Sequence, residues 1–225
     1  MTTPSHTAPA PSADAPRRPG GAEPVLGISG AVGGTPLVRL EHLFPDSGVE
    51  ILAKLESVNP GGSTKDRPAL AMVRDALDSG RLTAGGTVVE SSSGNLGVAL
   101  ARVCSVHGVR FVCVVDSRTN ATTVATIRAL GGEIDLVSEP DPVSGDLLTA
   151  RFRRVEQLKE EIPGAVNLFQ YGNPANPAAH AAGTMRETAE ALDHRLDVLM
   201  AAVSTTTQRV RCSLRACASP RKSWL

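Results

Sequence analysis

The period of the apolar positions changes repeatedly between residues 25 and 203, and this alternation predicts an α/β fold. Strands are expected at 35–40, 50–56, 86–91, 110–116, 133–138 and 197–203. Helices are expected at 67–80, 96–108, 122–132, 147–161 and 177–192. Apolar β-branched runs that alternate with helices indicate buried parallel strands linked by right-handed crossovers.

The two ends of the chain differ in composition from this central part. Residues 1–24 consist mainly of Pro, Ala, Ser and Thr, which offer little to bury, so we expect a disordered leader. Residues 207–225 contain arginine and cysteine but no acidic residue, and we interpret them as a tail outside the fold. Between them we expect 25–84 to form the first strands and helix of a larger domain, 85–172 a smaller α/β domain, and 173–206 the start of the remaining larger domain.

Composition and charge narrow the function classes. The chain has 225 residues, of which 41% are hydrophobic, enough for one sizeable core or two small ones. Its 23 basic and 23 acidic residues balance and aromatic residues make up 3%, so we expect no nucleic-acid surface. No apolar run approaches the roughly 20 residues that span a bilayer. The four cysteines show no metal-ligand spacing, so we expect a reduced, cytoplasmic protein without a metal site. Because no apolar run is long enough to span a bilayer, we also expect no membrane partner.

The stretch NPGGSTKDRP, residues 59–68, places Lys65 after two glycines, a serine and a threonine. A lysine with small neighbours and a partly desolvated amine is suited to forming a Schiff base. The alternative is a solvated surface lysine, although the positive end of a helix is an unfavourable place for a cation. A nucleotide P-loop is excluded, because in that motif the hydroxyl residue follows the lysine.

The stretch SSSGNLG, residues 91–97, connects an expected strand to an expected helix. Backbone N–H groups at such a junction point at one spot, on the positive end of the helix dipole. We therefore expect an anion site for a carboxylate or phosphate. The alternative is an ordinary α/β turn that uses Gly94 for its dihedral angles. The dinucleotide fingerprint G-x-G-x-x-G is absent after every expected strand.

Together with FQYGNPANPAAH at 169–180 and GGTPLVRL at 33–40, these two stretches resemble the cysteine synthase-like enzymes that depend on pyridoxal phosphate (PLP). The resemblance covers roughly residues 25–206. It implies PLP fold type II, the tryptophan synthase β-like fold, with two three-layer α/β domains on parallel sheets, the larger one incomplete here. It also implies PLP as cofactor, small amino-acid substrates and a homodimer.

The resemblance implies roles for individual residues. Lys65 would carry the cofactor and, once freed, remove the substrate α-proton, and Asn95 would contact the PLP ring hydroxyl. His180 lies in a matching stretch but receives no role. The residues expected to bind substrate are Ser92, Ser93, Gly94, Asn95, Leu96 and Gln170. Further cofactor-binding residues are expected to be Ser204, Thr205 and Thr206.

The substrate turn differs from the T-S-G-N-T-G of the commoner cysteine synthases, because Leu96 replaces a threonine whose hydroxyl would face the substrate. The serine-rich turn with leucine resembles the subgroup that joins O-phospho-L-serine to L-glutamate. That reaction gives N-(2-amino-2-carboxyethyl)-L-glutamate for 2,3-diaminopropionate, in siderophore or peptide-antibiotic pathways. We expect this β-substitution. Cysteine synthesis from O-acetyl- or O-phosphoserine and sulfide stays the alternative, because one hydroxyl discriminates only modestly.

The resemblance ends in VSTTTQRVRC, residues 203–212. The family has a glycine-rich loop here that cradles the cofactor phosphate, whereas this chain has no glycine after Gly183. We therefore expect a truncated or frame-shifted product whose last ~20 residues are out of register, judged by the change in charge composition. A catalytically silent remnant is then the alternative to an active synthase.

Overall fold

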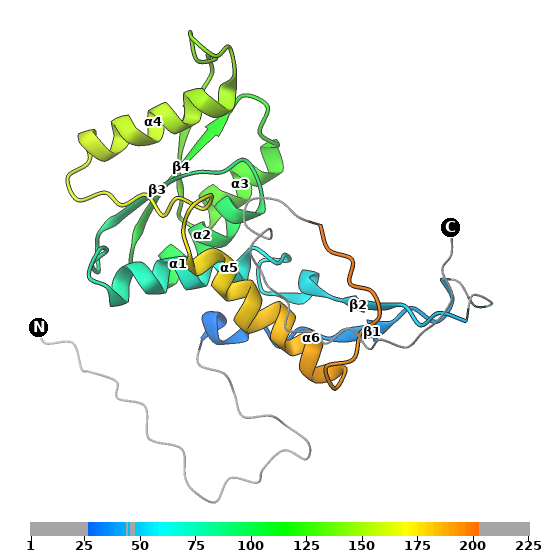
Figure 1. The fold of residues 1–225 in the computed structure, drawn as a ribbon. Helices are drawn as coiled ribbons and strands as arrows, with labels where there is room; N and C mark the ends of the chain where they lie inside the picture. The colour runs from blue at the N-terminus through cyan, green and yellow to red at the C-terminus, as the bar shows by residue number, and fades with distance from the viewer. Residues whose placement is uncertain (1–26, 44, 46–47, 203–225) are drawn as a thin grey trace, which may run out of the picture.

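The computed structural model describes residues 27–43, 45 and 48–202 and contains two sheets (Figure 1). The first pairs β1 (Leu37–Arg39) with β2 (Leu52–Lys54) in antiparallel orientation. The second is parallel, with β3 (Thr87–Ser91), β4 (Arg110–Asp116) and β5 (Glu133–Val137) in that order. The parallel strands and their crossover helices confirm the predicted α/β class.

The helices follow the expected segments closely. They are α1 (Asp66–Asp78), α2 (Asn95–Val106), α3 (Ala121–Ala129), α4 (Leu147–Glu161), α5 (Ala175–His180) and α6 (Arg186–Ala191). Short 3₁₀ turns occur at η1 (Ile28–Ala31) and η2 (Glu56–Val58). A π-helical turn, η3 (Ala181–Met185), joins α5 to α6. The structure therefore has α5, η3 and α6 in place of the single regular helix expected at 177–192.

Both faces of the parallel sheet are covered, which explains the nearly continuous apolar runs of β3 and β4. Val88 and Phe111 face α2 and α1, where the larger hydrophobic cluster lies. Val89 and Val112 face the opposite side, where they pack with Val155 of α4. This alternation is the period of two that a strand imposes on its side chains. Figure 1 shows α4 on one side of the sheet and α2 and α3 on the other.

Two features of the fold differ from the expectations. Val166 forms an isolated parallel bridge with Val88 and so extends the sheet beyond β3, which the sequence pattern did not indicate. The strand expected at 197–203 is wrong over its described part: 197–202 form no strand, and Met200 is 91% exposed. A buried parallel strand needs hydrogen-bonded neighbours, and none of the described strands pairs with this segment.

Within the described residues, the segments expected to form the larger domain contribute helices but no strands other than the antiparallel pair β1–β2. The parallel sheet of a larger domain and the division at 84/85 and 172/173 therefore stay predictions. In the described part of the chain, no helix is both long enough and apolar enough to cross a bilayer.

Candidate active site

Lys65 ends a tight turn and directly precedes α1. Gly62 N donates to Asn59 O at 2.7 Å, and Gly61 N donates to Asp66 Oδ2 at 2.9 Å, so both ends of the turn are closed by hydrogen bonds. A Cβ on Gly61 would lie 2.3 Å from Asp66 Oδ1, so glycine is required here. Lys65 is half-buried, and this burial lowers the pKa of its amine.

The lysine turn is attached to α2 by a buried ion pair. Asp66, the residue after Lys65, is 1% exposed and accepts from Arg102 Nη1 at 2.7 Å. Removing one partner of such a pair leaves an uncompensated buried charge, which is costly. The pair therefore fixes the start of α1 against the helix whose first turn carries the serine-rich stretch.

That serine-rich turn is closed from within by Ser92. Its side chain is buried, and its Oγ accepts from Gly97 N at 2.9 Å. Ser92 N donates to Val114 O of β4 at 3.2 Å, and Ser92 O accepts from the Cys113 thiol at 3.2 Å. These bonds hold the turn at the carboxyl edge of the parallel sheet, where α/β folds commonly bind ligands.

The outer side of the turn presents free hydrogen-bond donors. Within the described residues, the N–H groups of Ser93, Gly94, Asn95 and Leu96 have no acceptor. They lie at the positive end of α2, and the side chains of Ser93 and Asn95 are exposed. Unpaired N–H groups at a helix N-terminus favour an anion. The geometry therefore fits the predicted carboxylate or phosphate site.

Leu96 does not lie as we expected. Its side chain is 3% exposed and belongs to the hydrophobic core beside α2, because the second residue of the helix faces the sheet. Our interpretation of this side chain as one that faces the substrate is therefore corrected, and only its N–H group points to the turn's donor set. Leu96 cannot by itself distinguish between substrates through direct contact.

Gln170 is brought to the serine turn, as expected, but its side chain is engaged there. It is 6% exposed, and its Nε2 donates to Ser91 O at 3.1 Å. The backbone carbonyl of Gln170 accepts from Asn176 Nδ2 at 2.9 Å. In this arrangement Gln170 connects the end of β3 with the segment that leads into α5.

His180, to which the sequence analysis gave no role, lies near Lys65. Burial is the main reason that its pKa is lowered, and the positive charge of Lys65 lowers this pKa further. α5, which His180 ends, packs on α1. The motif NPANPAAH alone cannot show this proximity, because 115 positions separate the two residues in the printed numbering.

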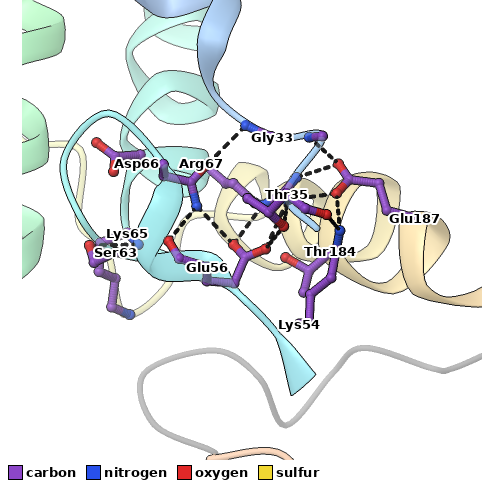
Figure 2. A network of polar contacts seen from close by, with 12 residues as sticks. Gly33, Thr35, Lys54, Glu56, Ser63, Lys65, Asp66, Arg67, Thr184 and Glu187 are labelled. Atoms are coloured by element: carbon purple, nitrogen blue, oxygen red, sulfur yellow. Dashed lines mark hydrogen bonds and ion pairs between the residues drawn. The ribbon is translucent and has the colours of Figure 1, made fainter. Parts of the chain in front are cut away.

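A cluster of four charged residues, Lys54, Glu56, Arg67 and Glu187, lies next to the lysine turn, and we call it the Arg67 cluster. Arg67 Nε lies 2.7 Å from Glu56 Oε2, and its Nη1 lies 2.7 Å from Glu187 Oε1 (Figure 2). Lys54 Nζ lies 2.7 Å from Glu187 Oε2. The sequence analysis missed this cluster, because its members come from β2, η2, α1 and α6.

The remaining cofactor residues, Ser204, Thr205 and Thr206, lie outside the described residues. Their predicted role is therefore neither supported nor contradicted by the structure.

Comparison with known proteins decides the family. The family model described as "Pyridoxal-phosphate dependent enzyme" matches residues 28–208. The chain belongs to this family of pyridoxal-phosphate-dependent enzymes. The match confirms the family that the four stretches imply, and with it the cofactor of that family.

Several known proteins are similar to this chain in sequence or in structure. An N-(2-amino-2-carboxyethyl)-L-glutamate synthase of Ralstonia nicotianae is 44% identical over 179 residues, covering 80% of this chain and 53% of the relative. The crystal structure of an O-ureido-L-serine synthase is 37% identical, with a TM-score of 0.68 and coverage of 75% and 51%. A hydrogen sulfide-producing enzyme from Fusobacterium nucleatum is 31% identical, with a TM-score of 0.72 and coverage of 80% and 57%.

These structural neighbours confirm the predicted fold type II class. The chain spans about half the length of the relatives that it matches.

The described residues fit the family's cofactor at one point and an amino-acid substrate at another. A half-buried amine with a lowered pKa suits an aldehyde partner. The unpaired N–H groups of the serine turn suit an amino-acid carboxylate.

Proposed function

We propose that the protein is a PLP-dependent enzyme that replaces the β-substituent of an O-activated L-serine with the amino group of L-glutamate. The product would be N-(2-amino-2-carboxyethyl)-L-glutamate. The observation that carries this proposal is the fixing of a half-buried Lys65 and a turn of unpaired N–H groups onto the same helix, α2. The 44% identity to a relative of that name supports the choice of product.

Lys65 has the properties that the reaction asks of a nucleophile and base. Burial lowers the pKa of its amine, so a larger fraction is unprotonated near neutral pH. The unprotonated amine can attack an aldehyde and, after release, can accept the α-proton of the substrate. Pyridoxal phosphate, when bound, supplies the electron sink for this proton removal.

The serine turn would orient the substrate. The N–H groups from Ser93 to Leu96 can hold the α-carboxylate, and the bond from Ser92 to Gly97 keeps the turn rigid. Gln170 would support this geometry through its bond to Ser91 O. Asn95, whose exposed side chain lies at the first position of α2, would contact the cofactor ring.

The finer points of the assignment are part of the same proposal. O-phospho-L-serine would be the donor with phosphate as leaving group, and Ser204, Thr205 and Thr206 would contact the cofactor. The product would serve 2,3-diaminopropionate formation for a siderophore or peptide natural product. The enzyme would be a homodimer in the cytoplasm. The family resemblance supports each of these points.

Covalent labelling tests the central role of Lys65. Purified protein is mixed with PLP and reduced with borohydride, and the modified lysine is identified by peptide mass spectrometry. We expect modification of Lys65 in the wild type, and its loss in Lys65→Ala but not in Lys159→Ala. Modification spread evenly over all four lysines, or none at all, would refute the proposal and favour a silent protein.

Product assays separate the two candidate reactions. Phosphate release from O-phospho-L-serine should depend on added L-glutamate. The competing candidate is cysteine synthesis, in which sulfide is the nucleophile, and the family resemblance keeps it open. Acetate release from O-acetylserine that depends on sulfide, without a response to glutamate, would establish that candidate in place of ours.

A further inference from the structure

Glu56 contacts both ends of the lysine turn. Its Oε2 accepts from Asn59 Nδ2 at 3.1 Å, and Asn59 is the first residue of the turn. The same oxygen accepts from Arg67 Nε at 2.7 Å, and Oε1 accepts from Arg67 Nη2 at 2.9 Å. Arg67 is the second residue after Lys65, so one carboxylate spans the turn that carries the lysine. Glu187, the other carboxylate on Arg67, makes no contact with Asn59.

Arg67 is a rigid anchor for this arrangement. Its side chain is 5% exposed and lies between two glycines. A Cβ on Gly33 would approach its Nη1 to 2.9 Å, and one on Gly183 to 2.6 Å. Gly183 belongs to the π turn between α5 and α6, a kind of turn that is frequent at functional sites. Because Arg67 belongs to the first turn of α1, its bonds to Glu56 fix Glu56 relative to the start of that helix.

The charge of Glu56 also reaches the surroundings of the lysine. Burial is the main cause of the lowered pKa of His180; Lys65 and Arg67 lower this pKa as well, and Glu56 raises it. Lys65 directly precedes α1, Arg67 lies in its first turn and Glu56 lies in η2, so these three charges come to His180 from the two elements around the lysine turn. Glu56 itself is ionised: burial acts to raise its pKa, but hydrogen bonds from Arg67 and Thr35 outweigh burial and lower it.

We propose that Glu56 is a positioning residue for Lys65: it holds Asn59 and Arg67 together across the lysine turn and supplies the negative charge that faces His180. The proposal deepens the proposed function, because it assigns the support of the lysine that would carry PLP. Glu56 acts through its neighbours and is not assigned a contact with substrate.

Glu56→Gln tests both parts, because it keeps the shape but removes the charge and one acceptor. We expect faster hydrogen exchange of the amides in 59–66, measured by mass spectrometry without any cofactor. By NMR, we expect the pKa of His180 to fall, because the negative charge of Glu56 acts to raise it. A general loss of stability would not lower the pKa of one histidine.

Glu187→Gln is the matched comparison, because it removes the other carboxylate from Arg67 without touching the turn. We expect it to leave exchange in 59–66 within twofold of the wild type. Glu190→Gln is the control for the loss of a negative charge. Glu190 is exposed on α6, 4.0 Å from Arg186, and its replacement should change neither the exchange in 59–66 nor the pKa of His180. Equal effects of Glu56→Gln and Glu187→Gln on the turn would overturn the proposal, as would an unchanged or raised pKa of His180.

A second variant keeps the proposal testable if Glu56→Gln does not fold. Asn59→Ala removes one end of the bridge and leaves the pair of Glu56 and Arg67 in place. We expect faster exchange in 59–66 and three- to tenfold slower PLP modification of Lys65, and unchanged exchange would refute the bridge. If wild-type Lys65 takes up no PLP, the proposed function fails, while the exchange and NMR results still decide the role of Glu56.

Discussion

Glu90, the residue of β3 before Ser91, is a carboxylic acid buried in the parallel sheet. Its side chain is 2% exposed, and Oε2 has no hydrogen-bond partner within the described residues. Oε1 accepts from Ser91 N, at 3.1 Å. Burial raises the pKa of Glu90 from 4.5 to about 7, and nearby amide groups, that of Ser91 first among them, offset part of this rise.

The sign of the effect on stability follows from this pKa. Between pH 4.5 and about 7 the folded protein keeps the proton on Glu90 while the unfolded chain loses it. The free energy of unfolding therefore falls as pH rises through this window and levels off above about pH 7. At 1.36 kcal/mol per pH unit, the loss attributable to Glu90 is roughly 3 kcal/mol.

Glu90→Gln removes the titrating group and keeps an acceptor for Ser91 N. We expect the variant and the wild type to have similar stability near pH 5, and the variant to be more stable by roughly 2–3 kcal/mol at pH 8. Urea unfolding at half-unit steps of pH measures the difference. Glu160→Gln, an exposed change on α4, should leave the pH dependence as it is. Parallel curves for Glu90→Gln and wild type would refute the buried-acid interpretation.

Other contacts of the site give predictions of their own. Asp66→Asn removes the charged partner of Arg102 and should lower the free energy of unfolding, measured in urea, by about 3 kcal/mol. It should also slow the PLP modification of Lys65. A decrease under about 1 kcal/mol would contradict this prediction. Ser92→Ala removes one of the two acceptors of the Gly97 amide, which also donates to Gly94 O at 3.0 Å. It should lower stability by about 1 kcal/mol, and an unchanged thermal midpoint would argue against a contribution of the Ser92 bond. Gly183→Ala adds a methyl group against the guanidinium of the Arg67 cluster and should cost about 1–3 kcal/mol, whereas a gain would show that the helix relaxes without strain.

The local pattern predicted the parallel sheet and its helices well, because these elements are set by neighbours in the sequence. The middle of β3 and most of β4 are buried and apolar, and Asn120 and Asp146 cap α3 and α4 through their side chains. The strand expected at 197–203 shows the opposite case. Its apolar run is compatible with a strand, but pairing depends on neighbours that the segment itself does not determine.

The candidate site was predictable only in part, for the same reason. Lys65 and the serine turn stand out because their chemistry is concentrated in short motifs. The Arg67 cluster and the proximity of His180 to Lys65 depend on how α5 and α6 lie against α1, and no spacing in the sequence shows this. Leu96 shows a further limit, since a motif gives the residue but not the direction of its side chain.

The two halves of the proposed chemistry are supported by separate contacts. The lysine turn depends on Glu56, Asp66 and Arg102, whereas the serine turn depends on Ser92 and on bonds from β4. These two sets share no hydrogen bond, so changes in one set should leave the other nearly unaffected, as expected for sites without common partners. Loss of Lys65 modification and loss of carboxylate binding can therefore be produced separately in this chain. A single substitution in either set that abolished both would show that the two turns are coupled through α2.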